Sequence, residues 1–125
     1  DLYTRVLADS GVVDASLRDQ VIISYTDSPA YRWQVFLKAS ALMAGESMGS
    51  EASYMKVFWS ELDVELHATA LRLLGDRGEL AGDAAWDDGQ WMSGYLFALS
   101  GPIYAGTNEI QRNIIAERVL GLPRK

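Results

Sequence analysis

The stretch that decides the fold is Ser50-Glu-Ala-Ser-Tyr-Met-Lys-Val-Phe-Trp-Ser-Glu-Leu-Asp-Val-Glu-Leu-His-Ala-Thr-Ala-Leu-Arg-Leu-Leu-Gly75. Its apolar residues recur at steps of three and four, which places them on one side of an α-helix. Ser50 and Glu51 suit the amino end of a helix as cap and dipole partner, and Gly75 suits a carboxyl-terminal stop. The pattern predicts a long helix over residues 51–74 with a buried stripe of Ala52, Met55, Trp59, Leu62, Leu66, Ala70 and Leu73.

A second long helix is predicted before this stretch. Asp14 is a suitable N-cap, and an apolar stripe follows it, made of Leu17, Val21, Tyr25, Tyr31, Val35, Ala39 and Leu42. We expect a kink or short break at Pro29, because proline removes a helical hydrogen bond. Residues 1–8 resemble the tail of a helix that begins upstream, with a stop at Asp9-Ser-Gly11.

Shorter elements are predicted after Gly75. The acidic, glycine-containing residues 75–88 indicate an exposed loop that Trp86 pins to the bundle. A short helix over 90–99 ends at Gly101-Pro102, and a final helix over 107–120 carries the apolar side Ile110, Ile114, Ile115 and Val119. No segment alternates like a strand. The sequence therefore predicts an all-α antiparallel helix bundle that forms a single helical domain over residues 1–125.

Composition excludes several classes of function. The formal charge of −6 makes nucleic acid an unsuitable partner, and no apolar run is long enough to span a membrane. The chain has no cysteine and one histidine, so a thiolate or multi-histidine metal site is impossible. We expect a soluble protein in the cytoplasm, with no metal.

A glycine-bearing loop leads into the final helix. Gly106 allows a ligand to approach the backbone closely, and Thr107 at the helix start can cap one amide while its neighbours face an anion. The alternative is an ordinary N-cap after an ordinary turn, and local chemistry alone favours this alternative. Both interpretations stay open at this point.

The carboxyl-terminal sequence resembles a known family. Tyr104-Ala-Gly-Thr-Asn-Glu-Ile-Gln-Arg112, followed by Asn113-Ile-Ile-Ala-Glu-Arg-Val-Leu-Gly-Leu-Pro123, is similar to the ending of the FAD-dependent acyl-CoA dehydrogenases. Residues 51–75 and 17–33 resemble the two preceding helices of that family. The resemblance covers nearly all of this chain but only the last third of a family member, and it implies a C-terminal helical domain whose first long helix is mostly missing.

The resemblance also implies cofactor-binding residues. In the family, the loop matching Ala105 to Thr107 lies beside the flavin, which implies FAD contacts for Gly106 and Thr107. Glu109 matches a position where a polar side chain commonly contributes. The alternative for Glu109 is a carboxylate that only complements the helix dipole.

A second set of residues is implied by the end of the penultimate helix, which in the family reaches the FAD of a neighbouring subunit. Arg72 and Gly75 occupy the matching positions, although Asp76 and Arg77 depart from the glycine-rich turn of many relatives. Arg18 is a further candidate for the pyrophosphate of FAD, without the arginine-phenylalanine pair that many relatives carry before this helix.

The catalytic base is the residue that the sequence does not supply. Dehydrogenation of an acyl-CoA removes a proton alpha to the thioester carbonyl, which needs a carboxylate within hydrogen-bond reach. Many relatives carry a glutamate where this chain has Ala105, and others supply it from an earlier helix, which here lies upstream of Asp1. Glu109 and Glu117 are the alternatives inside the chain, each better explained by its place on the helix.

Other polar residues are interpreted as structural. His67 is expected to be a half-exposed surface residue rather than a catalyst. Glu61, Asp63 and Glu65 are expected to form a solvated acidic face, because residues two apart on a helix diverge.

Two hypotheses of function follow. In the first, the chain is the C-terminal domain of an acyl-CoA dehydrogenase that oxidises an acyl-CoA thioester to the 2,3-enoyl-CoA, and it forms part of the FAD site and of the oligomer interface. In the second, it is a non-catalytic assembly module that pairs with a full-length dehydrogenase. Either way we expect the isolated chain to be inactive and to associate through helix faces, because a missing helix leaves apolar surface exposed.

Overall fold

The computed structural model describes residues 2–10 and 13–124, which form helices and turns and contain no strand. The predicted stop at Gly11 lies outside the described residues. The helices are α1 (Leu2–Ser10), α2 (Ala15–Met43), α3 (Glu51–Leu74), α4 (Gln90–Ala98) and α5 (Asn108–Ile114). The predicted all-α class is confirmed.

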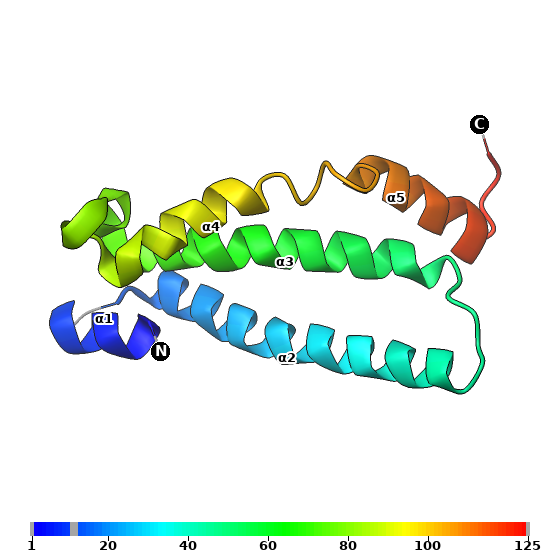
Figure 1. Ribbon diagram of the computed structural model, residues 1–125, viewed down its shortest axis with the longest axis horizontal. Coiled ribbons are helices and arrows are strands. Elements are labelled where there is room, and N and C mark those ends of the chain that lie inside the picture. The colour runs from blue at the N-terminus through cyan, green and yellow to red at the C-terminus, as the bar shows by residue number, and fades with distance from the viewer. Residues whose placement is uncertain (1, 11–12, 125) are drawn as a thin grey trace.

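The helices lie in three layers with α3 in the middle (Figure 1). α2 runs antiparallel to α3 on one side, and α4 and α5 follow one another along the other side, as the predicted antiparallel bundle requires. α1 contacts α3 near the carboxyl end of α3. Because α3 has neighbours on two sides, it holds half of the buried residues in the described part of the chain.

The buried residues of α3 differ from the predicted buried stripe. Of the predicted stripe only Ala70 and Leu73 are buried, and the other five members are half-buried. The remaining buried positions of α3 are Leu74 and the small polar residues Ser53, Ser60 and Thr69. A helix held between two layers approaches its neighbours closely through small side chains, so a single large apolar stripe was the wrong expectation.

Both ends of α3 have defined geometry. Gly75 has φ +56, a left-handed conformation that favours glycine, and its amide donates to the Leu71 carbonyl, so the predicted stop is confirmed. The predicted side-chain cap at Ser50 is wrong. Ser50 already has helical backbone angles (φ −65, ψ −7), and a cap side chain reaches the first-turn amides only from an extended backbone.

α2 is one continuous helix from Ala15 to Met43, so the predicted break at Pro29 is wrong (Figure 1). The Asp14 carboxylate accepts a hydrogen bond from the Leu17 amide at 3.0 Å, which confirms the predicted cap. Pro29 is exposed, so its ring faces away from α3. Proline removes only one helical hydrogen bond, and contact with α3 holds the helix on both sides of it.

No described residue of α2 is buried. The residues that approach α3 are half-buried, and several are polar, such as Gln20, Ser24 and Gln34. In the predicted stripe, Tyr25 (76% exposed), Val35, Ala39 and Leu42 are exposed, so the stripe is wrong at these positions. We call the side of α2 opposite α3 the α2 outer face, made of Ile22, Tyr25, Trp33, Phe36 and Met43, all of which are exposed.

The connection from α3 to α4 consists of three short 3-10 turns over residues 75–89. Trp86 packs against the buried cluster formed by α1 and α3, as predicted. The guanidinium groups of Arg5 and Arg77 lie over its ring, 4.8 and 4.7 Å from the centroid. Arg5 also forms an ion pair with Asp87 at 2.6 Å, so α1 is tied to this connection.

The final helix is shorter than predicted in its α-helical part. α5 ends at Ile114, and the chain continues as a π-helical turn over Ile115–Val119 before Gly121, whose φ is +68. Ile114 and Ile115 are half-buried, but Ile110 and Val119 are exposed, so half of the predicted apolar side is wrong. Among the described residues, no helix combines the length and apolar character needed to cross a membrane.

Candidate functional site

The loop between α4 and α5 has an unusual backbone at the positions singled out from the sequence. Ala105 and Gly106 have φ values of +55 and +85, and both residues are exposed. A left-handed alanine is uncommon and costs energy, so something must hold it in place. The Gln111 side chain does so by donating from Nε2 to the Ala105 carbonyl at 2.9 Å.

Gly106 is required by its surroundings as well as by its φ. A Cβ atom at this position would lie 2.8 Å from Nε2 of Gln111, the atom that holds Ala105. A side chain here would therefore displace the contact that fixes the loop. The result is a short exposed stretch of backbone with a methyl group at Ala105 and no side chain at Gly106.

Thr107 and Glu109 are the two further candidate residues at the start of α5. The Thr107 hydroxyl accepts from the Ile110 amide at 3.4 Å, so Thr107 is the N-cap that the sequence predicts. A hydrogen bond from its own backbone amide, followed by one with the Thr107 side chain, lowers the pKa of the Glu109 carboxyl. A carboxylate held in its charged form suits the helix start, and it is a weaker base than an ordinary glutamate.

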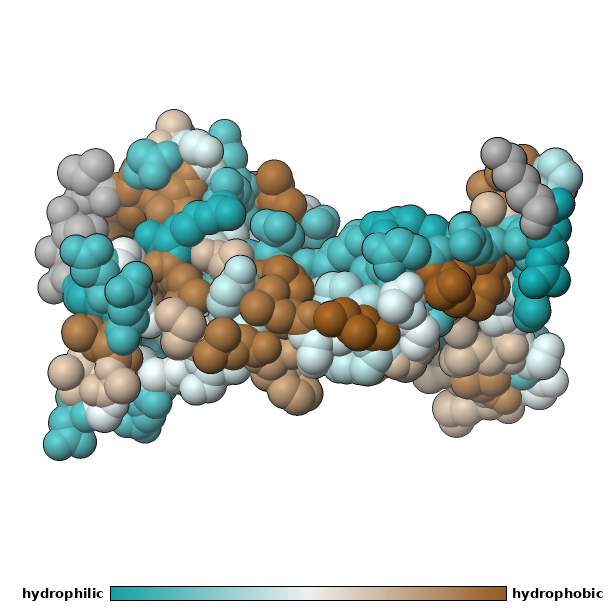
Figure 2. All heavy atoms as spheres, turned by 90° about the horizontal axis from the view of Figure 1, so that it is seen from above, coloured by the Kyte–Doolittle hydropathy of each residue, from teal (hydrophilic) through white to brown (hydrophobic). Residues whose placement is uncertain are grey.

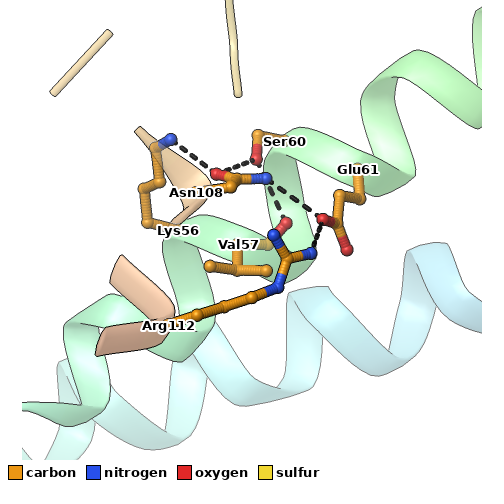
Figure 3. A network of polar contacts seen from close by, with 6 residues as sticks. All are labelled: Lys56, Val57, Ser60, Glu61, Asn108 and Arg112. Atoms are coloured by element: carbon orange, nitrogen blue, oxygen red, sulfur yellow. Dashed lines mark hydrogen bonds and ion pairs between the residues drawn. The ribbon is translucent and has the colours of Figure 1, made fainter. Parts of the chain in front are cut away.

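A buried polar network joins this helix start to α3 (Figure 3). Asn108 is only 2% exposed, and its Oδ1 accepts from Lys56 Nζ at 2.7 Å and from Ser60 Oγ at 3.1 Å. Its Nδ2 donates to Glu61 Oε1 at 3.2 Å, and Arg112 pairs with the same oxygen. The network therefore connects residues of α3 and α5 that are about fifty positions apart in the sequence.

Sequence reasoning missed this network. Glu61 was expected to belong to a solvated acidic face, and it is exposed as expected, but it also bonds Asn108 and Arg112, which was not predicted. The one available signal was Ser60, a small polar residue between Trp59 and Leu62 in an apolar stretch. Nothing local distinguishes the buried Asn108 from the exposed Asn113 five residues later.

The other predicted residues lie at the opposite end of α3. Arg72, three residues before Gly75, is exposed and donates from Nη1 to Gln20 Oε1 of α2 at 2.6 Å. Arg18 is exposed in the first turn of α2, and its neighbour Leu17 lines a pocket together with Arg72. Lys56, beside the loop, and Arg72 are separated by about 24 Å of helix at 1.5 Å per residue. The structure therefore divides the candidates into two groups, Gly106, Thr107 and Glu109 at one place and Arg18, Arg72 and Gly75 at another.

The remaining titratable candidates have structural contacts. His67 is half-buried, with its Nδ1 2.9 Å from the Asp63 carbonyl and its ring 6.0 Å from that of Trp91. Glu117 lies in the π-helical turn with Arg124 at 3.9 Å. These contacts agree with the structural interpretation of both residues.

Known proteins of one family match this helical bundle in sequence. The profile of the family described as "Acyl-CoA dehydrogenase, C-terminal domain" matches residues 5–120. The chain is 38% identical over 112 residues to "Acyl-CoA dehydrogenase IpdE1" of Mycolicibacterium smegmatis, which covers 90% of this chain and 27% of that protein.

Solved structures show the same fold. The structure described as "Tcur3481-Tcur3483 steroid ACAD G363A variant" superposes with a TM-score of 0.84 at 25% identity, covering 99% of this chain and 34% of that one. The ChsE4-ChsE5 complex from Mycobacterium tuberculosis superposes with a TM-score of 0.79 at 27% identity, covering 90% and 29%.

The fold and the loop thus define a helical domain of the acyl-CoA dehydrogenase type. The chain belongs to the acyl-CoA dehydrogenase family, in which it matches the C-terminal domain. It spans about a quarter to a third of the length of the relatives that it matches.

Proposed function

We propose that this chain is the C-terminal helical domain, a single unit over residues 1–125, of an FAD-dependent acyl-CoA dehydrogenase that oxidises an acyl-CoA thioester to the 2,3-enoyl-CoA. In this proposal it supplies one wall of the FAD site and a surface for assembly. The observation that carries the proposal is the exposed Ala105–Gly106 backbone, held left-handed by Gln111 inside the sequence signature of the family.

The geometry of the loop fits a flat ring system. Ala105 and Gly106 present backbone with almost no side chain, so the edge of a flavin is able to approach the main chain closely. Thr107 and Glu109 stand directly beside this backbone as polar contacts for the cofactor. Bound FAD would supply the hydride acceptor of the reaction.

The second group of candidates fits a different part of a cofactor. Arg18 and Arg72 are exposed cations at one end of the bundle, and Gly75 turns the chain there without a side chain. Cations suit a pyrophosphate. Because this group lies about 24 Å along α3 from the loop, we propose that it faces the FAD of a neighbouring subunit.

The proton at the alpha carbon must be removed by a group outside this chain. Ala105 carries no base, and Glu109 has a lowered pKa and a role at the helix start. We therefore propose that the chain orients cofactor and substrate, while the carboxylate comes from another part of the assembled enzyme. The acyl-CoA is bound by that assembly rather than by this chain alone.

The proposed assembly is supported by exposed apolar surface. A compact monomer of this mass has an accessible surface of about 6,600 Å², whereas this chain exposes 8419 Å². The excess of about 1,800 Å² is larger than the ~800 Å² that each partner buries in a standard interface. Exposed hydrophobic residues lie on the α2 outer face and on the face over α4 and α5, where they appear in several places (Figure 2).

A groove continues the α2 outer face toward α1. It is lined mainly by apolar residues of α1, α2 and α3 and includes Ile22 and Tyr25 of the outer face. We propose that this continuous surface receives another helical chain of the enzyme, either a second copy or a different subunit. Solved relatives have names that join two components, such as the ChsE4-ChsE5 complex. These names support a different subunit as the partner.

The substrate class and the location of the enzyme are further proposals. One solved relative is described as a steroid ACAD, which favours a bulky polycyclic acyl group over a straight chain. We propose a cytoplasmic enzyme.

The second hypothesis is a non-catalytic assembly module. It has the same fold, but it assigns no role to the Ala105–Gly106 loop, so the strained geometry of this loop is then unexplained.

A dehydrogenase assay distinguishes the hypotheses. The enzyme is isolated from its host with the chains that accompany this one, and acyl-CoA-dependent reduction of an electron acceptor is measured for the assembly and for the 125-residue chain alone. We expect activity for the assembly and none for the isolated chain. Activity of the isolated chain would show that it contains a base, and an inactive assembly would favour the assembly module.

A further inference from the structure

We propose that Asn108 is a positioning residue that fixes the Ala105–Thr107 loop on α3 through a set of directional hydrogen bonds. This inference rests on the proposed function for its consequence, because the loop is the part of the chain that we assign to the flavin. Its physical basis is the network between α3 and α5, which is independent of any cofactor.

The side chain of Asn108 is buried and its amide group is bonded at both ends. Oδ1 receives hydrogen bonds from Lys56 and Ser60, and Nδ2 donates to Glu61. Ser60 is itself 0% exposed. A buried polar group that loses its hydrogen-bond partner cannot bond to water instead, so the loss is costly. The site therefore favours an amide side chain, which accepts at one end and donates at the other, over other side chains.

The main chain of Asn108 closes the loop from the other side. Its amide donates to the Pro102 carbonyl at 2.9 Å, which joins the two ends of the loop. Residues 103–106 between these ends are exposed. Asn108 is thus the point where the loop is tied both to itself and to α3.

Ser60 is the corresponding point on α3. It donates to Asn108, and it also lies against Gly101, where an added Cβ would be 3.3 Å from the Cβ of Ser60. The residue before the loop and the residue after it therefore contact the same serine. The position of the strained Ala105 relative to α3 depends on these two contacts.

The direction of the bond between Asn108 and Glu61 provides a specific test. In Asn108→Asp, the carboxylate still accepts from Lys56 and Ser60, but it cannot donate and it faces Glu61. In Asn108→Asp combined with Glu61→Gln, the donor moves to residue 61 and the bond is restored with the opposite polarity. A residue that only fills space would respond to neither change in this pattern.

The experiment is amide hydrogen exchange followed by mass spectrometry, on the protein in its native assembly. We expect exchange in peptides covering residues 103–111 to rise about tenfold in Asn108→Asp, the scale of one lost buried hydrogen bond. In the double variant it returns to within about twofold of wild type. Peptides from the middle of α2 stay unchanged and report that the bundle is intact.

Control variants separate the other contributions. Glu61→Gln alone removes the ion pair with Arg112 but keeps an acceptor for Asn108, so a small change is expected. Glu65→Gln changes an exposed acid one turn further along α3 and is expected to have no effect. Ser60→Ala removes one of the two donors to Oδ1, and its smaller rise gives a graded test if Asn108→Asp does not fold.

Flavin retention of the same samples separates this inference from the proposed function. Loss of flavin in Asn108→Asp and its recovery in the double variant support both. A loop that loosens and recovers while flavin retention stays constant supports the positioning role and contradicts the flavin wall. Loop exchange within twofold of wild type in Asn108→Asp and Ser60→Ala, or a double variant no tighter than the single, overturns the inference whatever the flavin does.

Discussion

The two sides of α3 are built differently. Toward α5, contact is made through buried polar residues, with Ser60 and Asn108 almost fully enclosed and hydrogen-bonded to each other. Toward α2, no described residue of the partner helix is buried, and the opposite side of α2 carries exposed aromatic residues such as Trp33 and Phe36.

This difference shows which contacts the chain completes by itself. Directional hydrogen bonds between α3 and α5 fix one geometry, as the loop requires. α2 has apolar residues on a side where this chain provides no cover, and such a surface is typical of a helix that contacts other chains. In the proposed function, the first side shapes the FAD site, and the second is the surface that we propose for assembly with another chain.

Trp33→Glu tests the α2 outer face and has the largest expected effect. Trp33 is 70% exposed and stacks edge-on with Phe36, their ring centroids 6.0 Å apart. A charge at this position would be buried in the proposed interface, so we expect association to weaken at least about tenfold, as for an interface hot spot. Analytical ultracentrifugation over a concentration series measures this change.

Leu80→Glu is the matched control. Leu80 is also exposed, but it lies in the connection between α3 and α4 rather than on α2. We expect its assembly to be unchanged. Equal association of Trp33→Glu and wild type would mean that the α2 outer face is not the interface.

Glu51→Gln gives a smaller effect on the contact between α2 and α3. A hydrogen bond from its own backbone amide, and then the Lys38 ammonium at 3.2 Å, lower the pKa of the Glu51 carboxyl. A carboxyl with a lowered folded pKa stabilises the fold above its unfolded pKa and loses that contribution as the pH falls through the folded value. The contribution is therefore present above about pH 4.5 and is lost below it.

The measurement is the melting temperature at pH 6 and at pH 3. We expect wild type to lose slightly more stability than Glu51→Gln over this range, a difference of a few degrees at most, because the ion pair is exposed. An equal fall of the melting temperature in both proteins would mean that the Glu51 ion pair does not stabilise the contact between α2 and α3.

Much of the fold was predictable from the sequence because it is local. The caps at Asp14 and Thr107 and the stop at Gly75 follow from side chains that bond the nearest backbone or allow a left-handed turn. The short break expected at Pro29 does not occur, because contact with α3 outweighs one lost hydrogen bond. Burial was misjudged wherever it depends on neighbours that helical periodicity does not reveal, as at Tyr25 and Ile110.

Only part of the candidate site could be predicted from the sequence, for the same reason. The conformation of Gly106 and the cap at Thr107 belong to the loop itself, and the sequence marks both. The partners of Asn108 are about fifty residues away, and their polar types look like ordinary surface residues of a helix. The separation of Arg72 from the loop likewise depends on how the helices are arranged, not on spacing along the chain.

Flavin affinity of the native assembly tests the central claim most directly, with Gly106→Val compared to Gly45→Val. Both glycines have positive φ, +85 and +90, so both substitutions strain the backbone, but only Gly106 lies in the loop beside Gln111. After flavin removal, FAD titration should show affinity about tenfold weaker for Gly106→Val, the scale of one lost contact, because the added side chain displaces Gln111 and covers the exposed backbone. Affinity should stay near wild type for Gly45→Val, where an added Cβ has no neighbour within 4 Å. Wild-type affinity in Gly106→Val would contradict the assignment of this loop to the flavin site.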